Sequence, residues 1–143
     1  MPAIDRTIVV EGDQQTVWDY LSDFTNTEEW DPPTRTTERL SGDGGLGTVY
    51  RNVSKFLGKE VETTYTVVGH EPPHRLTLDG DSGSVQLHDE ITVEQEGTQV
   101  RVQYHAEFHP QGAAKLVQPL LPLGLKKLGD DSAQQLERCL RRL

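Results

Sequence analysis

Asp89 and Tyr104 are the residues of this 143-residue chain whose types and spacing best fit acid–base chemistry. They lie in VQLHDEITV and VRVQYHAEF, where every second residue is otherwise apolar. A turn at Glu96-Gly97 would pair these stretches as an antiparallel hairpin and set Asp89 opposite Tyr104. A carboxylate beside a phenol on an apolar face would have a raised pKa and could move a proton on a ketone-bearing substrate.

The same pair has two other interpretations. The tyrosine hydroxyl would satisfy the aspartate and hold two strands in register, which is favoured because the hairpin places no second acid–base group with the pair. Alternatively, both side chains would form hydrogen bonds to a bound ligand. The sequence leaves the structural, binding and catalytic roles of Asp89 and Tyr104 open.

Further polar residues share the expected inner face of the sheet. A turn at Gly58-Lys59 would pair a second set of alternating stretches and set Asn52 opposite Tyr65. An unpartnered buried polar group costs about 1–3 kcal/mol, so these groups must bond one another, water or a ligand. A mostly apolar pocket with a few convergent polar groups is typical of a small-molecule site. The polar residues of this face are Asn52, Ser54, Thr63, Tyr65, Asp89 and Tyr104.

Histidines gather on the opposite face of the Asp89 hairpin. His88 would face His105 directly, close enough to share a divalent metal, with Glu107 and His109 on the same face. A zinc site needs three or four well-placed ligands, and in this register Glu107 is opposed by Gln86. We therefore expect solvated strand residues and no metal site, a conclusion that a one-residue shift in register would reverse.

Signatures of several enzyme classes are absent from the sequence. There is no G-x-S-x-G, Walker, paired CxxC or dinucleotide-binding motif, so we expect no cofactor. The GDGGLG stretch at 42–47 precedes a strand rather than a helix, which is typical of a hairpin connection. Cys139 lies in a leucine-rich segment and is expected in the core rather than as a nucleophile.

Composition and charge exclude further function classes. A net charge of -9 argues against nucleic-acid binding, which needs clustered Lys and Arg. Apolar residues make up 34% of the chain, in runs too short to span a bilayer, so we expect no stable membrane insertion and leave transient membrane contact open. The N-terminal residues do not resemble a secretory signal and the single cysteine fits a reducing compartment. We expect a cytoplasmic monomer.

Two helical stretches follow the first expected strand, IDRTIVVE at 4–11. Asp13 would cap one short helix, and Ser22 would cap a second that ends near Asn26. Pro32-Pro33 rules out further helix. Trp18 is then expected at the edge of the core, whereas Trp30 would follow the helix in a loop, where its ring would line the cavity mouth or close the core.

The rest of the chain changes period twice. From 35 to 109 the apolar period is two, and the turns divide the segment into six strands. The following leucines recur at helical spacing and predict one long helix with a single stripe facing the sheet. We therefore predict one α+β domain over residues 1–143, with an antiparallel sheet curving around a C-terminal helix. The leucines of the stripe are Leu121, Leu125, Leu128, Leu136, Leu140 and Leu143.

The order of elements carries a resemblance to a known family. Together with VWDYLSDFTNTEEWDP, LGTVYRNVSKFLGKEVETTYTVVGHEPPHRL and EGTQVRVQYHAEFHPQG, it resembles the START-like (SRPBCC) superfamily of polyketide cyclases/dehydrases and lipid-transport proteins. The resemblance implies the helix-grip fold: a seven-stranded curved antiparallel sheet around the C-terminal helix, with two short helices between strands one and two. It also implies a cavity for a small hydrophobic or amphipathic ligand, but no single activity, since members include lipid carriers, hormone receptors and aromatic polyketide cyclases.

Three functional hypotheses follow. The first is a non-catalytic binding or transport protein for a lipid-like or aromatic polyketide-like molecule. The second is a polyketide cyclase or dehydrase in which Asp89 or Tyr104 transfers a proton. The third is a protein-interaction module with a vestigial cavity. For the first two, the expected ligand-binding residues are Trp30, Tyr50, Asn52, Thr63, Tyr65, Leu87, Asp89, Tyr104, Leu121 and Leu125.

Overall fold

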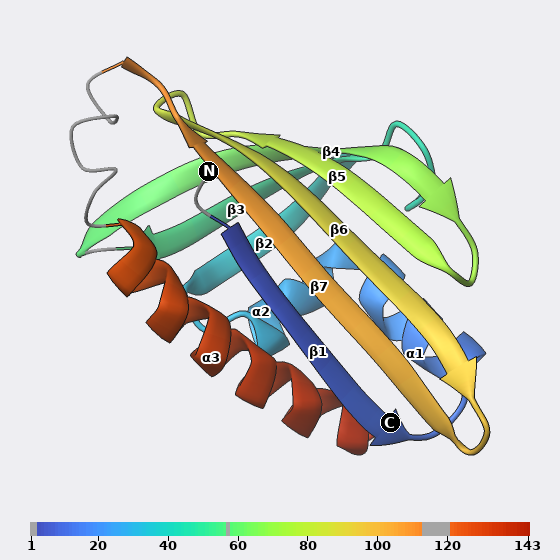
Figure 1. The fold of residues 1–143 in the computed structure, drawn as a ribbon. Coiled ribbons are helices and arrows are strands. Elements are labelled where there is room, and N and C mark those ends of the chain that lie inside the picture. Colours follow the sequence, from blue (N-terminus) through green and yellow to red (C-terminus); the bar gives the residue numbers. More distant parts are fainter. Residues whose placement is uncertain (1–2, 57, 113–120) are drawn as a thin grey trace.

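A single antiparallel sheet dominates the computed structural model, which describes residues 3–56, 58–112 and 121–143. Its seven strands are ordered β1-β7-β6-β5-β4-β3-β2 and curve around one long helix, α3 (Figure 1). The helices are α1 (Gln14–Ser22), η1 (Phe24–Asn26), α2 (Thr27–Trp30) and α3 (Leu121–Arg141). The strands are β1 (Ala3–Glu11), β2 (Thr34–Ser41), β3 (Val49–Phe56), β4 (Lys59–Glu71), β5 (Arg75–Asp81), β6 (Val85–Glu96) and β7 (Gln99–Pro110). The predicted α+β helix-grip fold is confirmed.

The short helices differ from the prediction at their ends. Asp13 caps α1 as expected, since its carboxylate accepts a hydrogen bond from the Thr16 backbone N–H at 3.1 Å. The next turn is capped by Asp23 rather than Ser22, and helical structure continues through α2 to Trp30. Trp30 is therefore the last residue of a helix and is only 2% exposed, so its expected place in a loop was wrong.

The register of both predicted hairpins was wrong by two residues. Asn52 pairs with Thr63, not Tyr65, and Asp89 pairs with Ala106, not Tyr104. The reason is the position of the turn glycines: β4 begins at Lys59 directly after Gly58, and β6 extends to Glu96, the residue before Gly97. Because strand side chains alternate with a period of two, a shift of two residues leaves every side chain on its expected face.

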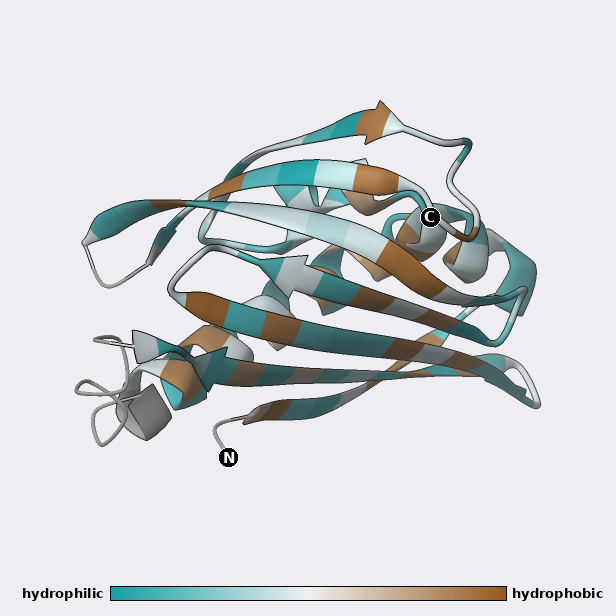
Figure 2. Ribbon diagram, turned by 90° about the horizontal axis from the view of Figure 1, so that it is seen from above, coloured by the Kyte–Doolittle hydropathy of each residue, from teal (hydrophilic) through white to brown (hydrophobic). Residues whose placement is uncertain are grey.

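The core lies on the concave face of the sheet. Hydrophobic and hydrophilic residues alternate along the strands (Figure 2). Helix α3 packs on β1 and α2, while α1 packs on β6. The largest buried cluster joins strand residues to helix residues and includes Val17, Leu21, Phe24, Leu78, Ile91, Val102 and Leu136. Within the described part of the chain, no helix combines the length and apolar character needed to cross a membrane.

Hydrogen bonds from Arg6, which we call the Arg6 clamp, hold α3 against β1. The Arg6 guanidinium donates hydrogen bonds to the Asp130 carboxylate and to the Lys126 carbonyl oxygen, each at 3.2 Å. Gly129 makes room for this contact, because a Cβ atom there would lie 2.8 Å from the guanidinium. The helix is thus held close to β1, at one side of the concave face.

Gly80 of β5 makes room for an aromatic side chain on the same face. It pairs with Tyr65 of β4, and a Cβ atom at Gly80 would lie 2.8 Å from a ring carbon of Tyr65. The absence of a side chain at this position therefore sets the position of the Tyr65 ring.

We predict that Gly80→Ala destabilises the protein by about 1–3 kcal/mol, because the new methyl group must displace the buried Tyr65 ring. Urea denaturation followed by circular dichroism measures the change in free energy of unfolding. Gly45→Ala is the matched control, since its methyl group would meet only the ends of the Asp43 and His70 side chains. Equal midpoints for the two variants would contradict the assigned role of Gly80.

Candidate functional site

A cavity of about 130 Å³ lies between the concave face of the sheet and α3. A single buried water needs roughly 10–15 Å³, so this space is large enough for a small organic molecule or several waters. Residues from β1, β3, β4, β6, β7, α3 and two connecting segments line it: Ile4, Asp31, Pro33, Asn52, Ser54, Val61, Thr63, Tyr65, Ser82, Ser84, Val85, Leu87, Asp89, Tyr104, Phe108, Leu128 and Ser132.

Six of the expected ligand-binding residues line this cavity together: Asn52, Thr63, Tyr65, Leu87, Asp89 and Tyr104. Their convergence follows from the two-residue period, which places them on one face despite the wrong register. The polar inner face that we predicted from the sequence therefore forms part of the cavity wall.

The other expected ligand-binding residues lie elsewhere. Trp30 is buried behind the wall, with its ring edge-on to Tyr104 at a centroid distance of 5.6 Å. Tyr50 packs against Phe24, also at 5.6 Å, and Leu125 belongs to a small cluster beside β1. None of these three is among the residues that line the cavity in the described structure. The side chain of Leu121 lies outside the described residues.

Asp31 is a cavity residue that the sequence interpretation missed. Its Oδ2 accepts a hydrogen bond from the Thr34 hydroxyl at 2.6 Å, and its Oδ1 accepts one from the Ser132 hydroxyl at 3.3 Å. Pro32 holds Asp31 in an extended conformation, since a residue before proline avoids helical angles. The signal in the sequence was a carboxylate directly before two prolines, but its contact with Ser132 joins residues 101 positions apart.

A line of hydrogen bonds connects Asp31 to the sheet. The Asn52 amide donates to the Thr34 hydroxyl at 3.0 Å and to the Thr37 hydroxyl at 2.9 Å. Thr34 in turn donates to Asp31. Asn52 thus uses both amide hydrogens on its neighbours, and this network fixes the Asp31 carboxylate at the cavity wall.

The Asp89 carboxyl group accepts fewer hydrogen bonds than that of Asp31. It is 3% exposed, and its Oδ2 accepts a long hydrogen bond of 3.5 Å from the Tyr104 hydroxyl. Its Oδ1 is buried and has no hydrogen-bond partner among the described residues. Tyr104 is therefore a diagonal neighbour of Asp89 on the inner face, and one carboxylate oxygen of Asp89 is left unsatisfied.

Burial and a neighbouring negative charge determine the protonation of Asp89. Burial and the neighbouring Asp31 carboxylate together raise the pKa of Asp89 to about 7, against the opposing effects of His88, Tyr104 and His105. Burial also raises the pKa of Asp31, but the hydrogen bonds from Thr34 and Ser132 stabilise its charged form. We therefore expect Asp31 to carry the negative charge more readily than Asp89.

The two phenols of the cavity stay protonated. Burial raises the pKa of Tyr65 and of Tyr104 well above the usual value, and the nearby Asp89 and Asp31 carboxylates add to the effect. Both hydroxyl groups are therefore hydrogen-bond donors at neutral pH. The cavity combines apolar walls with two carboxyl groups and two neutral phenols, a set that can bind donors or exchange a proton.

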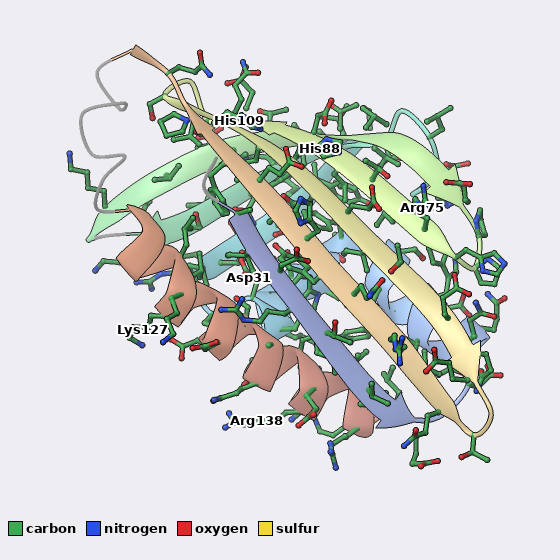
Figure 3. The ribbon with its side chains drawn as sticks, viewed as in Figure 1. Asp31, Arg75, His88, His109, Lys127 and Arg138 are labelled. Atoms are coloured by element: carbon green, nitrogen blue, oxygen red, sulfur yellow. The ribbon has the colours of Figure 1, made fainter. Side chains whose placement is uncertain are left out.

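The histidines lie on the outer face of the sheet, as predicted, but in different pairs. His88 pairs with Glu107 rather than with His105, and its ring bonds to the Asp79 carboxylate at 2.6 Å. His105 and His109 both bond to Glu107, at 2.9 Å and 3.2 Å. His88 and His109 point away from Asp31, which lies between the sheet and α3 (Figure 3). Across residues 3–56, 58–112 and 121–143, no group of three or more such ligands is placed to hold a metal ion.

Comparisons with known proteins agree with this architecture. The family model described as "Polyketide cyclase / dehydrase and lipid transport" matches residues 1–141. The Zhui aromatase/cyclase from Streptomyces sp. R1128 superposes with a TM-score of 0.81 at 15% identity, covering 99% of this chain and 94% of its own. A comparison with curated proteins gives no match.

Two further solved structures share the fold. A conserved protein from Geobacillus kaustophilus has a TM-score of 0.76 at 16% identity and covers 99% of this chain and 96% of its own. A START superfamily protein from Mycobacterium smegmatis has a TM-score of 0.73 at 14% identity, covering 96% and 98% respectively. At these identities the superpositions show a common fold.

We predict that Asp89→Asn changes how stability depends on pH. Because the pKa of Asp89 rises from 3.8 to about 7 on folding, the native state binds the extra proton between these values. The wild type therefore loses stability as pH rises through this window, by about 1.4 kcal/mol for each pH unit, and the loss persists above pH 7. Asp89→Asn should not show this loss. Its free energy of unfolding, measured by urea denaturation, should therefore increase relative to that of the wild type between pH 4.5 and pH 8.

Glu62→Gln provides the control, since it removes one negative charge from the outer face of strand β4. This variant should follow the pH profile of the wild type between pH 4.5 and pH 8. A wild-type profile in Asp89→Asn would contradict the assigned pKa of Asp89.

Proposed function

Because the chain belongs to the polyketide cyclase/dehydrase and lipid transport family, we propose that it binds a small hydrophobic or amphipathic molecule in the cavity between the sheet and α3. Such binding is common to the carriers and the cyclases that the family description names. The Asp31 and Asp89 carboxyl groups would orient the polar part of the ligand, and the apolar walls would hold the rest.

The observation that carries this proposal is a set of apolar side chains that face one space without filling it. In a packed core these side chains would be fully buried, whereas here they remain partly accessible around the cavity. Removing apolar surface from water contributes roughly 25 cal/mol per Å², so an apolar ligand at this site gains affinity from each of them. The partly accessible apolar residues are Val61, Val85, Leu87, Phe108 and Leu128.

A second candidate function is a cyclase or dehydrase. The observation that favours it is the pKa of Asp89, about 7, beside the Tyr104 hydroxyl and a second carboxyl group, Asp31. An acid–base group acts best when its pKa lies near the working pH. Ionised Asp89 would take an acidic C–H proton from a poly-ketone chain, while the Tyr104 hydroxyl would stabilise the enolate oxygen.

We predict that Leu87→Trp reduces binding of a neutral amphiphile by at least tenfold, because the indole would occupy the space of the ligand. The probe is 1-hexanol, titrated by isothermal calorimetry, with one site expected in the wild type. Leu40→Trp is the matched control, since Leu40 is 51% exposed on β2 and should leave binding unchanged.

Two outcomes would contradict the binding proposal. One is equal affinity for 1-hexanol in Leu87→Trp and the wild type. The other is a wild type that takes up no alcohol and carries no hydrophobic molecule in native mass spectrometry after mild purification. The second result would favour an interaction module with a vestigial cavity.

The cyclase candidate predicts that Tyr104→Phe lowers turnover of a linear triketone by at least tenfold while the protein still binds 1-hexanol. The rate should rise with pH up to about 7 and then level off, since Asp89 acts in its ionised form. Absorbance of the cyclised product measures the rate. Tyr20→Phe is the control, because the Tyr20 hydroxyl bonds to Glu29 away from the cavity. A wild type without turnover, or equal rates in both variants, would remove this candidate.

A further inference from the structure

The polar part of the cavity contains two carboxyl groups and no basic side chain among its lining residues in the described structure. Its other ionisable groups are the phenols of Tyr65 and Tyr104, which add donors but no positive charge. Resting on the function proposed above, we infer that the natural ligand is a hydrophobic amine whose ammonium group binds Asp89 and Asp31.

The unsatisfied oxygen of Asp89 is the first argument. Its Oδ1 lies buried in a residue that lines the cavity and has no donor among the described residues. Buried acceptors are almost always hydrogen-bonded, and leaving one unpaired costs about 1–3 kcal/mol. A ligand that supplies a donor at this point recovers that cost. An ammonium group offers three donors and no acceptor, which suits the two carboxyl groups of the cavity.

Charge distinguishes an amine from other amphiphiles. A carboxylate or phosphate ligand would meet two acidic residues without a Lys or Arg in the wall to neutralise it. A ketone or ester offers only acceptors and leaves Asp89 Oδ1 unpaired. An alcohol satisfies that oxygen but leaves the negative charge of the carboxylates uncompensated in a low-dielectric site. An ammonium group both donates a hydrogen bond to Asp89 Oδ1 and compensates the negative charge of the carboxylates.

The charged groups around Asp89 add a dependence on pH. Asp31, Tyr65 and Tyr104 face it within the cavity, and His88 and His105 lie on the outer face of the same strands. Burial and Asp31 raise the pKa of Asp89, while both histidines and the Tyr104 hydroxyl lower it, and the net result is a pKa of about 7. An ammonium ligand needs the ionised carboxylate, so it must displace the proton from Asp89. Binding near pH 7 should therefore release a proton.

The test uses three probes with one apolar chain: hexylamine, 1-hexanol and sodium hexanoate. Isothermal calorimetry at pH 8 should show the amine binding at least tenfold more tightly than the alcohol, with hexanoate weakest. Below pH 7 the amine should lose roughly tenfold in affinity per pH unit, while the alcohol changes little. Near pH 7, two buffers of different ionisation enthalpy should reveal proton release on amine binding.

Variants connect the selectivity to Asp89. Asp89→Asn should bind 1-hexanol but lose its preference for hexylamine, whereas Glu62→Gln, which removes a charge from the outer face of β4, should keep that preference. Should Asp89→Asn fail to fold, proton release by the wild type still decides the inference. An alcohol bound as tightly as the amine, or a preference that survives in Asp89→Asn, overturns the amine assignment and leaves the binding function standing. Failure of all three probes to bind overturns both.

Discussion

One helix cannot cover the concave face of a seven-stranded sheet, and this difference in width determines where the cavity forms. Strands lie about 4.8 Å apart, so seven span about 29 Å, whereas a helix with its side chains is about 10–12 Å wide. The Arg6 clamp holds α3 against β1, and α1 covers β6. The remaining face, between α3 and the middle strands, is left open and becomes the binding space.

The Asp31 network joins the stability of the fold to the electrostatics of the cavity. Its hydrogen bonds connect Asn52 of β3, Thr34 of β2 and Ser132 of α3 through one carboxyl group. The same carboxyl group also contributes to the raised pKa of Asp89. Contacts that hold α3 in place at this point therefore also influence the protonation of Asp89, so the position of α3 and the charge of the site are not independent.

The sequence predicted which face of the sheet each residue lies on better than it predicted which residue pairs with it across the strands. Alternation identified Asn52, Thr63 and Asp89 as inner-face residues, because a two-residue error in register does not change the face. The error itself arose because a turn glycine is compatible with either central position of a short loop. Asp31 was missed because its role depends on Ser132, a long-range contact that no local pattern reports. Trp30 was misplaced because a further short helix, α2, begins directly after Asn26 and ends at Trp30.

The separation of the two sheet faces also bears on how such proteins diverge. Outer-face residues such as His88 and Glu107 set surface charge, and inner-face residues such as Leu87 and Asp89 shape the cavity, although all belong to the same two strands. Substitutions on one face leave the packing of the other intact. Changes that suit a new ligand and changes that suit a new surrounding solution can therefore fall on alternate positions of one strand, in keeping with a fold that this chain shares with solved structures at 10–19% sequence identity.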